Sequence, residues 1–214
     1  MRLAMDRHAR IKGDTLIEVM FAFSIFALVA VGSLTIMNQG VATAQRSLEI
    51  TLVRAQMDAQ AEAIRYIHQA YVAAYQAGGA APTGTAAEWI KMTSKTSGKG
   101  ADSASPYGQV DGINCPATTP GQHPFILNTH TATVEDSAPQ SVGPADGSLP
   151  PFSQVRYLGS TVQAAYGIWV EAVPSPVSAN GTSFVDFHIR TCWTGAGTAR
   201  PMTLGTIVRL YEPR

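Results

Sequence analysis

The sequence has little charge, and what it has is balanced. Only 14% of its 214 residues are Asp, Glu, Lys or Arg, and the formal net charge is zero. This balance gives no support for a broadly nucleic-acid-binding surface. Apolar residues make up 45% of the chain, and no charged residue lies between Val19 and Gln45. The length suits one domain of ordinary size plus an appendage.

The sequence also lacks the common signatures of catalysis and cofactor binding. It contains no G-x-S-x-G nucleophile motif, no phosphate-binding loop and no dinucleotide-binding glycine pattern. His68, His123, His130 and His188 are scattered, without the spacing that places two metal ligands on one helix face. We therefore expect no enzyme activity, no metal site and no cofactor.

Cysteine is scarce as well. The two cysteines, Cys115 and Cys192, belong to no C-x-x-C or Cys/His cluster, so a zinc site is not expected. If this part of the chain lies outside the cell membrane, a disulfide that closes the long loop is the natural interpretation. In the chain-entropy model it stabilises the fold by about 4 kcal/mol. Two buried, unpaired thiols are the alternative.

What the chain does have is a basic start followed by a long apolar run. Residues 1–13 hold four basic side chains against one acidic, and the rest of the chain holds 11 basic against 14 acidic. The 19 residues from Val19 to Met37 are all uncharged, and as a helix they extend about 28 Å, close to the thickness of a bilayer core. This order predicts a membrane-inserted chain with its basic end in the cytoplasm.

A secretory signal peptide is a weaker interpretation of the same segment. The apolar run is too long for a typical signal-peptide core. Ala42 and Ala44 flank Thr43, which matches the small-x-small pattern of a cleavage site. Cleavage after Ala44 therefore stays open from the local sequence. However, neither Pro nor Gly interrupts the helical pattern between Gly40 and Gly78.

One carboxylate breaks the apolar pattern. Glu18 lies just inside the hydrophobic start, after Leu16 and Ile17. A carboxylate within a membrane helix costs about 2.5–3.5 kcal/mol on insertion scales at the helix centre, so it needs a partner. Either Glu18 sits at the headgroup level, or it pairs with a cation that another chain brings.

The residues around Glu18 resemble a known targeting signal. The segment from Lys12 to Val19 reads KGDTLIEV and precedes about twenty apolar residues. It resembles the class III signal of type IV pilins and type II secretion pseudopilins. The resemblance implies cleavage by a prepilin peptidase between Gly13 and Asp14. It also implies that Glu18 neutralises the new N-terminal amine of a neighbouring subunit during filament assembly.

The resemblance leaves several readings open. In this family the new N-terminus is methylated, but the family usually has an apolar residue where this chain has Asp14, so methylation there stays open. The chain has no Pro before Pro82, whereas many major pilins have one within the helix. Both departures favour a minor pilin or a pseudopilin. The alternatives are a DNA-uptake minor pilin and a signal-anchored surface protein outside any filament.

The implied partners are the peptidase, other pilin subunits with their assembly machinery, and the membrane. The chain would be a single-pass protein of the cytoplasmic membrane before assembly, and part of an extracellular or periplasmic filament afterwards.

The helical pattern continues beyond the apolar run as an amphipathic stretch. Gly78 and Gly79 predict its end, which gives one helix of roughly 60 residues. Apolar residues at steps of three or four predict a buried stripe: Ile50, Val53, Met57, Ala61, Ile64, Ile67, Tyr71 and Tyr75.

The last third of the chain predicts strands. Four apolar or alternating runs are separated by turn residues: Gln154–Leu158, Ala165–Val173, Ser183–Trp193 and Thr203–Tyr211. We expect an α+β fold, in which the long N-terminal helix packs on one antiparallel sheet of about four strands. The predicted parts are a leader (1–13), an apolar helix (14–45), an amphipathic helix (46–77), a variable surface region (78–151) and the sheet (152–214). The surface region is expected to contain a short helix near Ala86–Thr93.

Two weaker patterns concern the predicted surface region and a later loop. Lys91, Lys95 and Lys99 near Trp89 form the one candidate cluster for nucleic acid, but a solvated loop is the favoured explanation for them. The sequon from Asn180 to Thr182 fits glycosylation but is more simply a turn.

Overall fold

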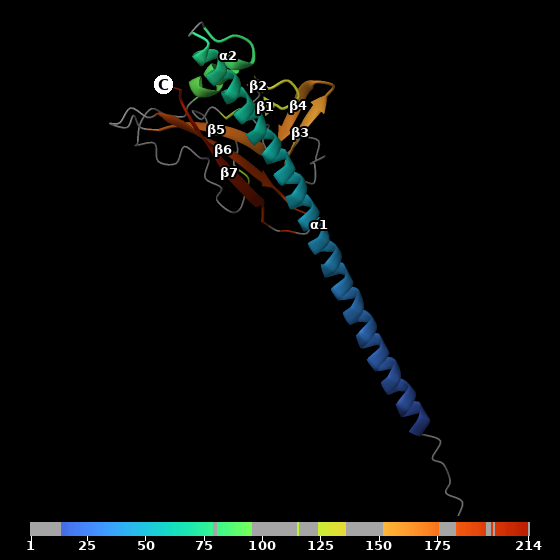
Figure 1. Cartoon of the computed structure of the whole chain (residues 1–214). Helices are drawn as coiled ribbons and strands as arrows, with labels where there is room; N and C mark the ends of the chain where they lie inside the picture. Colours follow the sequence, from blue (N-terminus) through green and yellow to red (C-terminus); the bar gives the residue numbers. More distant parts are fainter. Residues whose placement is uncertain are drawn as a thin grey trace, which may run out of the picture. The chain divides into compact units, whose positions relative to one another are not determined.

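In the computed structural model, the described residues are 14–78, 81–95, 115, 124–135, 152–175, 183–195, 198 and 200–213. The chain divides into two compact units, Met1–Gln45 and Arg46–Arg214. Helix α1, Asp14–Gln76, contributes residues to both (Figure 1). The boundary between the units lies where the uncharged stretch ends at Gln45 and the first charged residue, Arg46, follows.

The second unit combines the last 31 residues of α1 with one short helix and three antiparallel sheets. The sheets are β1–β2, β3–β4 and β5–β6–β7. α1 is followed by Gly78, whose φ of 117° requires glycine. The other elements are α2 (Thr85–Ser94), β1 (Ile126–Asn128), β2 (Thr133–Glu135), β3 (Gln154–Leu158), β4 (Thr161–Tyr166), β5 (Ile168–Pro174), β6 (Phe184–Trp193) and β7 (Met202–Tyr211).

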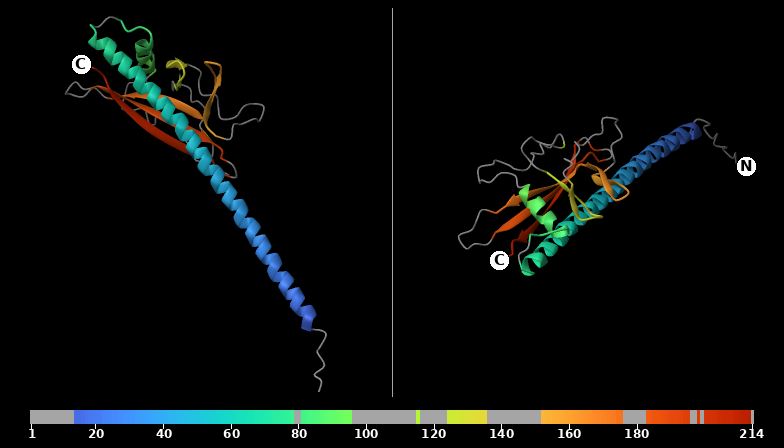
Figure 2. Two further views of the ribbon diagram at one scale, coloured as in Figure 1. Left: turned by 45° about the vertical axis from the view of Figure 1, so that its right-hand side comes forward. Right: turned by 90° about the horizontal axis from the view of Figure 1, so that it is seen from above.

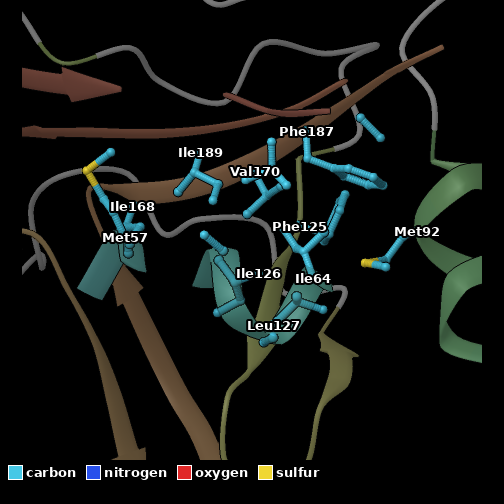
Figure 3. Close-up of a cluster of buried hydrophobic side chains, with 14 of the residues drawn as sticks. Met57, Ile64, Met92, Phe125, Ile126, Leu127, Ile168, Val170, Phe187 and Ile189 are labelled. Atoms are coloured by element: carbon cyan, nitrogen blue, oxygen red, sulfur yellow. The ribbon is translucent and has the colours of Figure 1, made fainter. Parts of the chain in front are cut away.

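The core of this unit lies between α1 and one face of the β5–β6–β7 sheet (Figure 2). Figure 3 shows Met57 and Ile64 of α1 among side chains from β5, β6 and β1, together with Phe125, which directly precedes β1. The predicted stripe is confirmed from Val53 to Ile67, which are buried. Ile50 and Tyr71 pack at the margin of the core, whereas Tyr75 is 44% exposed. The last turn of α1 therefore projects this tyrosine away from the core.

Strand β6 shows why the sheet has one dry face. Val185, Phe187, Ile189 and Thr191 are buried, and the residues between them from Asp186 to Arg190 are only half-buried. This alternation confirms the pattern predicted for the strand, since successive side chains of a strand point to opposite faces.

The prediction of one sheet of about four strands is wrong. The predicted strand Ala165–Val173 is broken at Gly167, whose φ is 59°. Ala165 lies in β4 and pairs with β3, whereas Ile168 begins β5 and pairs with Thr191 of β6. The glycine turn thus sends one apolar run into two different sheets, a change of direction that hydrophobicity alone does not reveal.

Within the predicted surface region 78–151, the described residues also contribute to the core. The described parts of this stretch supply α2, β1 and β2, and their apolar islands are core residues. Trp89 is 2% exposed, and Phe125, Ile126 and Leu127 are fully buried. The short helix predicted at Ala86–Thr93 is confirmed as α2.

Candidate functional site

The most unusual surface of the molecule is the apolar part of α1. From Leu16 to Gln45 every side chain is exposed or half-buried, and Phe21, Phe23 and Phe26 are 68–71% exposed. This is the one helix among the described residues that is long and apolar enough to cross a membrane, with a peak mean hydropathy of 2.3. Apolar side chains at this density need a nonaqueous surrounding, such as lipid or other helices.

The polar side chains within this segment are suited to such a surrounding. Ser24, Ser33 and Thr35 each donate a hydrogen bond of 2.8–2.9 Å to the carbonyl oxygen four residues earlier. A hydroxyl bonded to its own helix leaves no donor unpaired when water is removed. These residues therefore add little cost when the segment enters an apolar phase.

Glu18 differs from the hydroxyls because it carries a full charge. It is exposed on α1, and no described residue forms an ion pair or hydrogen bond with it. Beside it, Val19, Ala22, Phe23 and Phe26 form an exposed apolar surface on one helix face. A partner helix packed on this surface would bring its own groups close to Glu18.

The predicted cleavage site is only partly within the described residues. Gly13 and the rest of the leader lie outside them, and so does the side chain of Asp14, although Asp14 is the first residue of α1. The predicted sequon at Asn180 and the candidate ligand His123 are likewise outside the described residues.

Cys115 and Cys192 are joined in a disulfide, with their Cα atoms 5.5 Å apart. This agrees with the disulfide interpretation of the sequence rather than with two unpaired thiols. The bond ties Cys115 to the end of β6, next to Trp193 of the core. Disulfides of this kind are typical of proteins that fold outside the cytoplasm.

The candidate nucleic-acid cluster is not assembled. Trp89 is buried and packs against Tyr71, His68 and Phe187, so it offers no face for a base. Lys91 forms an ion pair of 2.6 Å with Glu88 of the same helix, and Lys99 lies outside the described residues. Trp89 lies in the short helix α2 and faces the core, so the residues of this weaker pattern do not form one surface.

The structure reveals a buried acid that the sequence patterns did not single out. Glu171 of β5 is 1% exposed, and its Oε1 accepts a 2.7 Å hydrogen bond from the indole of Trp169. Its Oε2 is buried and has no hydrogen-bond partner among the described residues. Burial raises the pKa of Glu171, although the Trp169 bond and the charge of Arg190 oppose the shift. The available signal was one carboxylate within the apolar run Ala165–Val173.

Across the strand pair, His188 lies opposite Glu171. Burial lowers the pKa of His188, and the positive charge of Arg190 lowers it further, while Asp186 acts in the opposite direction. Asp186 itself accepts two 2.8 Å hydrogen bonds from Arg209 of β7. On this face of the sheet, Asp186 and Arg209 therefore form an ion pair that links β6 to β7.

Comparison with known proteins gives no relative, since no protein-family model, no curated protein and no solved structure matches this chain.

Proposed function

We propose that this chain is a structural subunit of a type IV pilus or a related filament. In this proposal a prepilin peptidase cuts it after Gly13, and residues 14–45 then pack among the same helices of other subunits. The second unit, with its own core and disulfide, forms the outer part of the filament. The role is structural, without catalysis or a cofactor.

The observation that carries the proposal is an exposed apolar helix segment whose carboxylate, Glu18, has no ion-pair partner among the described residues. Glu18 lies five residues after Gly13, and it has no partner among the described residues. A buried carboxylate and a buried ammonium are each costly alone, but much less so as a pair. Cleavage after Gly13 would create that ammonium on a neighbouring subunit.

A plain membrane anchor explains the apolar residues but gains nothing from Glu18. A lipid-facing helix is more stable in the bilayer without a carboxylate near its start. The leader signal from Lys12 to Val19 also supports the filament over the anchor, because it contains Glu18, from which a plain anchor gains nothing. Pseudopilins and DNA-uptake pilins share this signal, so the choice among these related filaments depends on the second unit.

In this scheme the chain begins as a single-pass protein of the cytoplasmic membrane, with its N-terminus in the cytoplasm. Assembly then moves it into a filament outside that membrane. The balance of 11 basic and 14 acidic side chains after residue 13, against the basic leader, supports this orientation.

Intact-mass measurement of the chain from producing cells tests the proposal directly. The full chain is expressed with and without the prepilin peptidase, and Gly13→Leu serves as the matched variant in which cleavage is blocked. We expect a mature form that begins at Asp14 only when the peptidase and Gly13 are both present. A mature protein that keeps Met1, or one cut after Ala44, would contradict the proposal.

A further inference from the structure

A hollow of about 620 Å³ lies in the second unit, between α1 and the turn that joins β1 to β2. On the α1 side it is lined by Ala59, Glu62, Ala63 and Tyr66, and on the other side by the turn Thr129–Ala132. Thr85, the first residue of α2, closes one end. Small-molecule sites in proteins have volumes of roughly 300–1,000 Å³.

Two of the four helix residues that line the hollow are alanines. Ala59 and Ala63 are four positions apart, so they stack on one face of α1 and leave space above them. Tyr66, one turn further along, is 57% exposed and presents its ring at the rim. A partly exposed aromatic ring beside polar groups provides a flat apolar surface with hydrogen-bonding groups around it.

The opposite wall is held rigidly before any ligand arrives. Asn128 is 3% exposed, and its Oδ1 accepts hydrogen bonds from the backbone N–H groups of His130 and Thr131 at 3.0 and 3.3 Å. Its Nδ2 donates a 2.7 Å bond to the carbonyl of Ser160. The ring of His130 stacks on Tyr157, with centroids 4.1 Å apart and an angle of 18°. A preformed wall lowers the entropic cost of binding.

The charges around the hollow favour a neutral ligand. Among the described residues that line it, Glu62 is the one acidic side chain, and no Lys or Arg is present. Glu62 is paired with Arg65 at 2.5 Å, so its charge is already compensated. An anionic ligand would have to compete with Glu62 for Arg65, and a cationic ligand would have to compete with Arg65 for Glu62.

We propose that this hollow binds a neutral, hydroxyl-rich ligand, namely a short uncharged saccharide. Threonine hydroxyls and the carboxylate of Glu62 exchange hydrogen bonds with sugar hydroxyls, and the ring of Tyr66 packs on the apolar face of a sugar ring. The hydroxyls of Thr129 and Thr131 are already bonded to Tyr157 and Thr133, but each hydroxyl has further hydrogen-bonding capacity that a sugar hydroxyl can use. The proposal concerns the second unit alone and does not depend on filament assembly.

Binding of the full chain, in detergent, to an array of neutral, anionic and amine-bearing oligosaccharides tests this proposal. Two variants alter the hollow: Tyr66→Ala removes the ring, and Ala59→Trp fills the space. Two matched controls on the same helix, Tyr75→Ala and Ala73→Trp, change exposed residues outside it. Thermal unfolding of each variant shows whether the fold is retained.

We expect a neutral oligosaccharide to bind, with its affinity reduced roughly tenfold or more by Tyr66→Ala and by Ala59→Trp. The two controls should change the affinity by less than about twofold. The proposal is overturned if no neutral oligosaccharide binds, or if only anionic or amine-bearing ones do. Binding that both hollow variants leave intact would overturn it equally.

Discussion

The side chain of Gln60 and the backbone of Leu127 form two hydrogen bonds with each other. The Gln60 Nε2 donates to the Leu127 carbonyl, and its Oε1 accepts from the Leu127 N–H, each at 2.8 Å. Gln60 is 1% exposed and Leu127 is fully buried. The side-chain amide of Gln60 thus makes the two backbone hydrogen bonds that a neighbouring strand would otherwise make with Leu127. This attaches the short strand β1 to α1.

Replacing Gln60 with Leu should destabilise the second unit. The substitution keeps the approximate volume but leaves the N–H and C=O of Leu127 without partners in the core. Each unpaired buried group costs about 1–3 kcal/mol, so for the two groups we expect a loss of roughly 2–6 kcal/mol in unfolding free energy. Urea denaturation of the full chain in detergent measures it.

Gln69→Leu is the matched control, because Gln69 is exposed on the same helix. Its effect should stay within about 0.5 kcal/mol. If Gln60→Leu were as stable as this control, the pairing with Leu127 would contribute nothing measurable.

The sequence predicted the buried face of α1 but not the role of Gln60. Val53, Ile64 and Ile67 recur at the period of a helix, which is a local pattern of the sequence. Gln60 interacts with Leu127, 67 positions away, and β1 is only three residues long. Short strands and buried polar pairs arise from tertiary contacts, which no local pattern records.

Gly167→Ala should be far more disruptive than Gly159→Ala. Both glycines have left-handed φ angles, 59° and 63°, so alanine is strained by about 1–2 kcal/mol at either position. A Cβ on Gly167 would also lie 2.0 Å from the Cys192 carbonyl oxygen, whereas at Gly159 it meets nothing within 4 Å. We expect an additional loss of roughly 1–3 kcal/mol at Gly167.

Thermal or urea unfolding of the two glycine variants separates these contributions. Their difference measures the close approach of β5 to β6, because the backbone strain is common to both. Equal destabilisation would mean that Gly167 marks only a turn, and that the break between β4 and β5 has another cause.

Loss of the Cys115–Cys192 bond should destabilise the second unit substantially. The two residues are 77 positions apart, and in the chain-entropy model a loop of that length stabilises the fold by about 4 kcal/mol. Reduction with a thiol and the double variant Cys115→Ser with Cys192→Ser should lower the unfolding free energy to a similar extent. If the double variant alone were destabilised, the serines rather than the missing bond would be responsible.

The stability of the second unit should fall as the pH rises above about 4.5, because of Glu171. Burial raises its pKa from the ordinary value of 4.5. Between that value and the raised one, the folded chain holds a proton that the unfolded chain has lost, so increasing pH favours unfolding. The glutamine of the Glu171→Gln variant cannot titrate, so the unfolding free energy of this variant should decline less over this pH range.

Urea denaturation at several pH values compares the two proteins, with Trp fluorescence as the signal. His188 acts in the opposite direction, since its lowered pKa reduces stability as the pH falls below its ordinary value of 6.5. The difference in pH dependence of stability between the wild-type chain and Glu171→Gln isolates the contribution of Glu171. Identical pH profiles would contradict a raised pKa for Glu171.

The candidate sites differ in how far the sequence reveals them. Glu18 and the apolar segment are local features, so composition and spacing were sufficient to single them out. Glu171 and the hollow beside Tyr66 depend on which strands and turns come together. Gly167, which redirects the chain between two sheets, is the residue at which sequence-based prediction of the fold failed.

Glu18→Ala should block filament incorporation while membrane insertion continues. Insertion should become easier, because the variant removes a carboxylate that costs up to about 2.5–3.5 kcal/mol within an apolar helix. Incorporation should fail, because the new amine of a neighbouring subunit would enter the apolar filament core without a counter-charge. Immunoblots of membranes and of sheared filaments measure the two outcomes separately.

Ser24→Ala is the matched control in the same segment. Its hydroxyl is already bonded to the carbonyl of Met20, so its loss leaves no group unpaired and assembly should be unchanged. Glu18→Gln keeps the size of the side chain and removes only its charge, and it should behave like Glu18→Ala. Filaments that contain Glu18→Gln but not Glu18→Ala would show that side-chain size rather than charge matters at this position. Normal amounts of both variants in filaments would reject the charge pairing and leave Glu18 as a headgroup-level residue of an ordinary anchor.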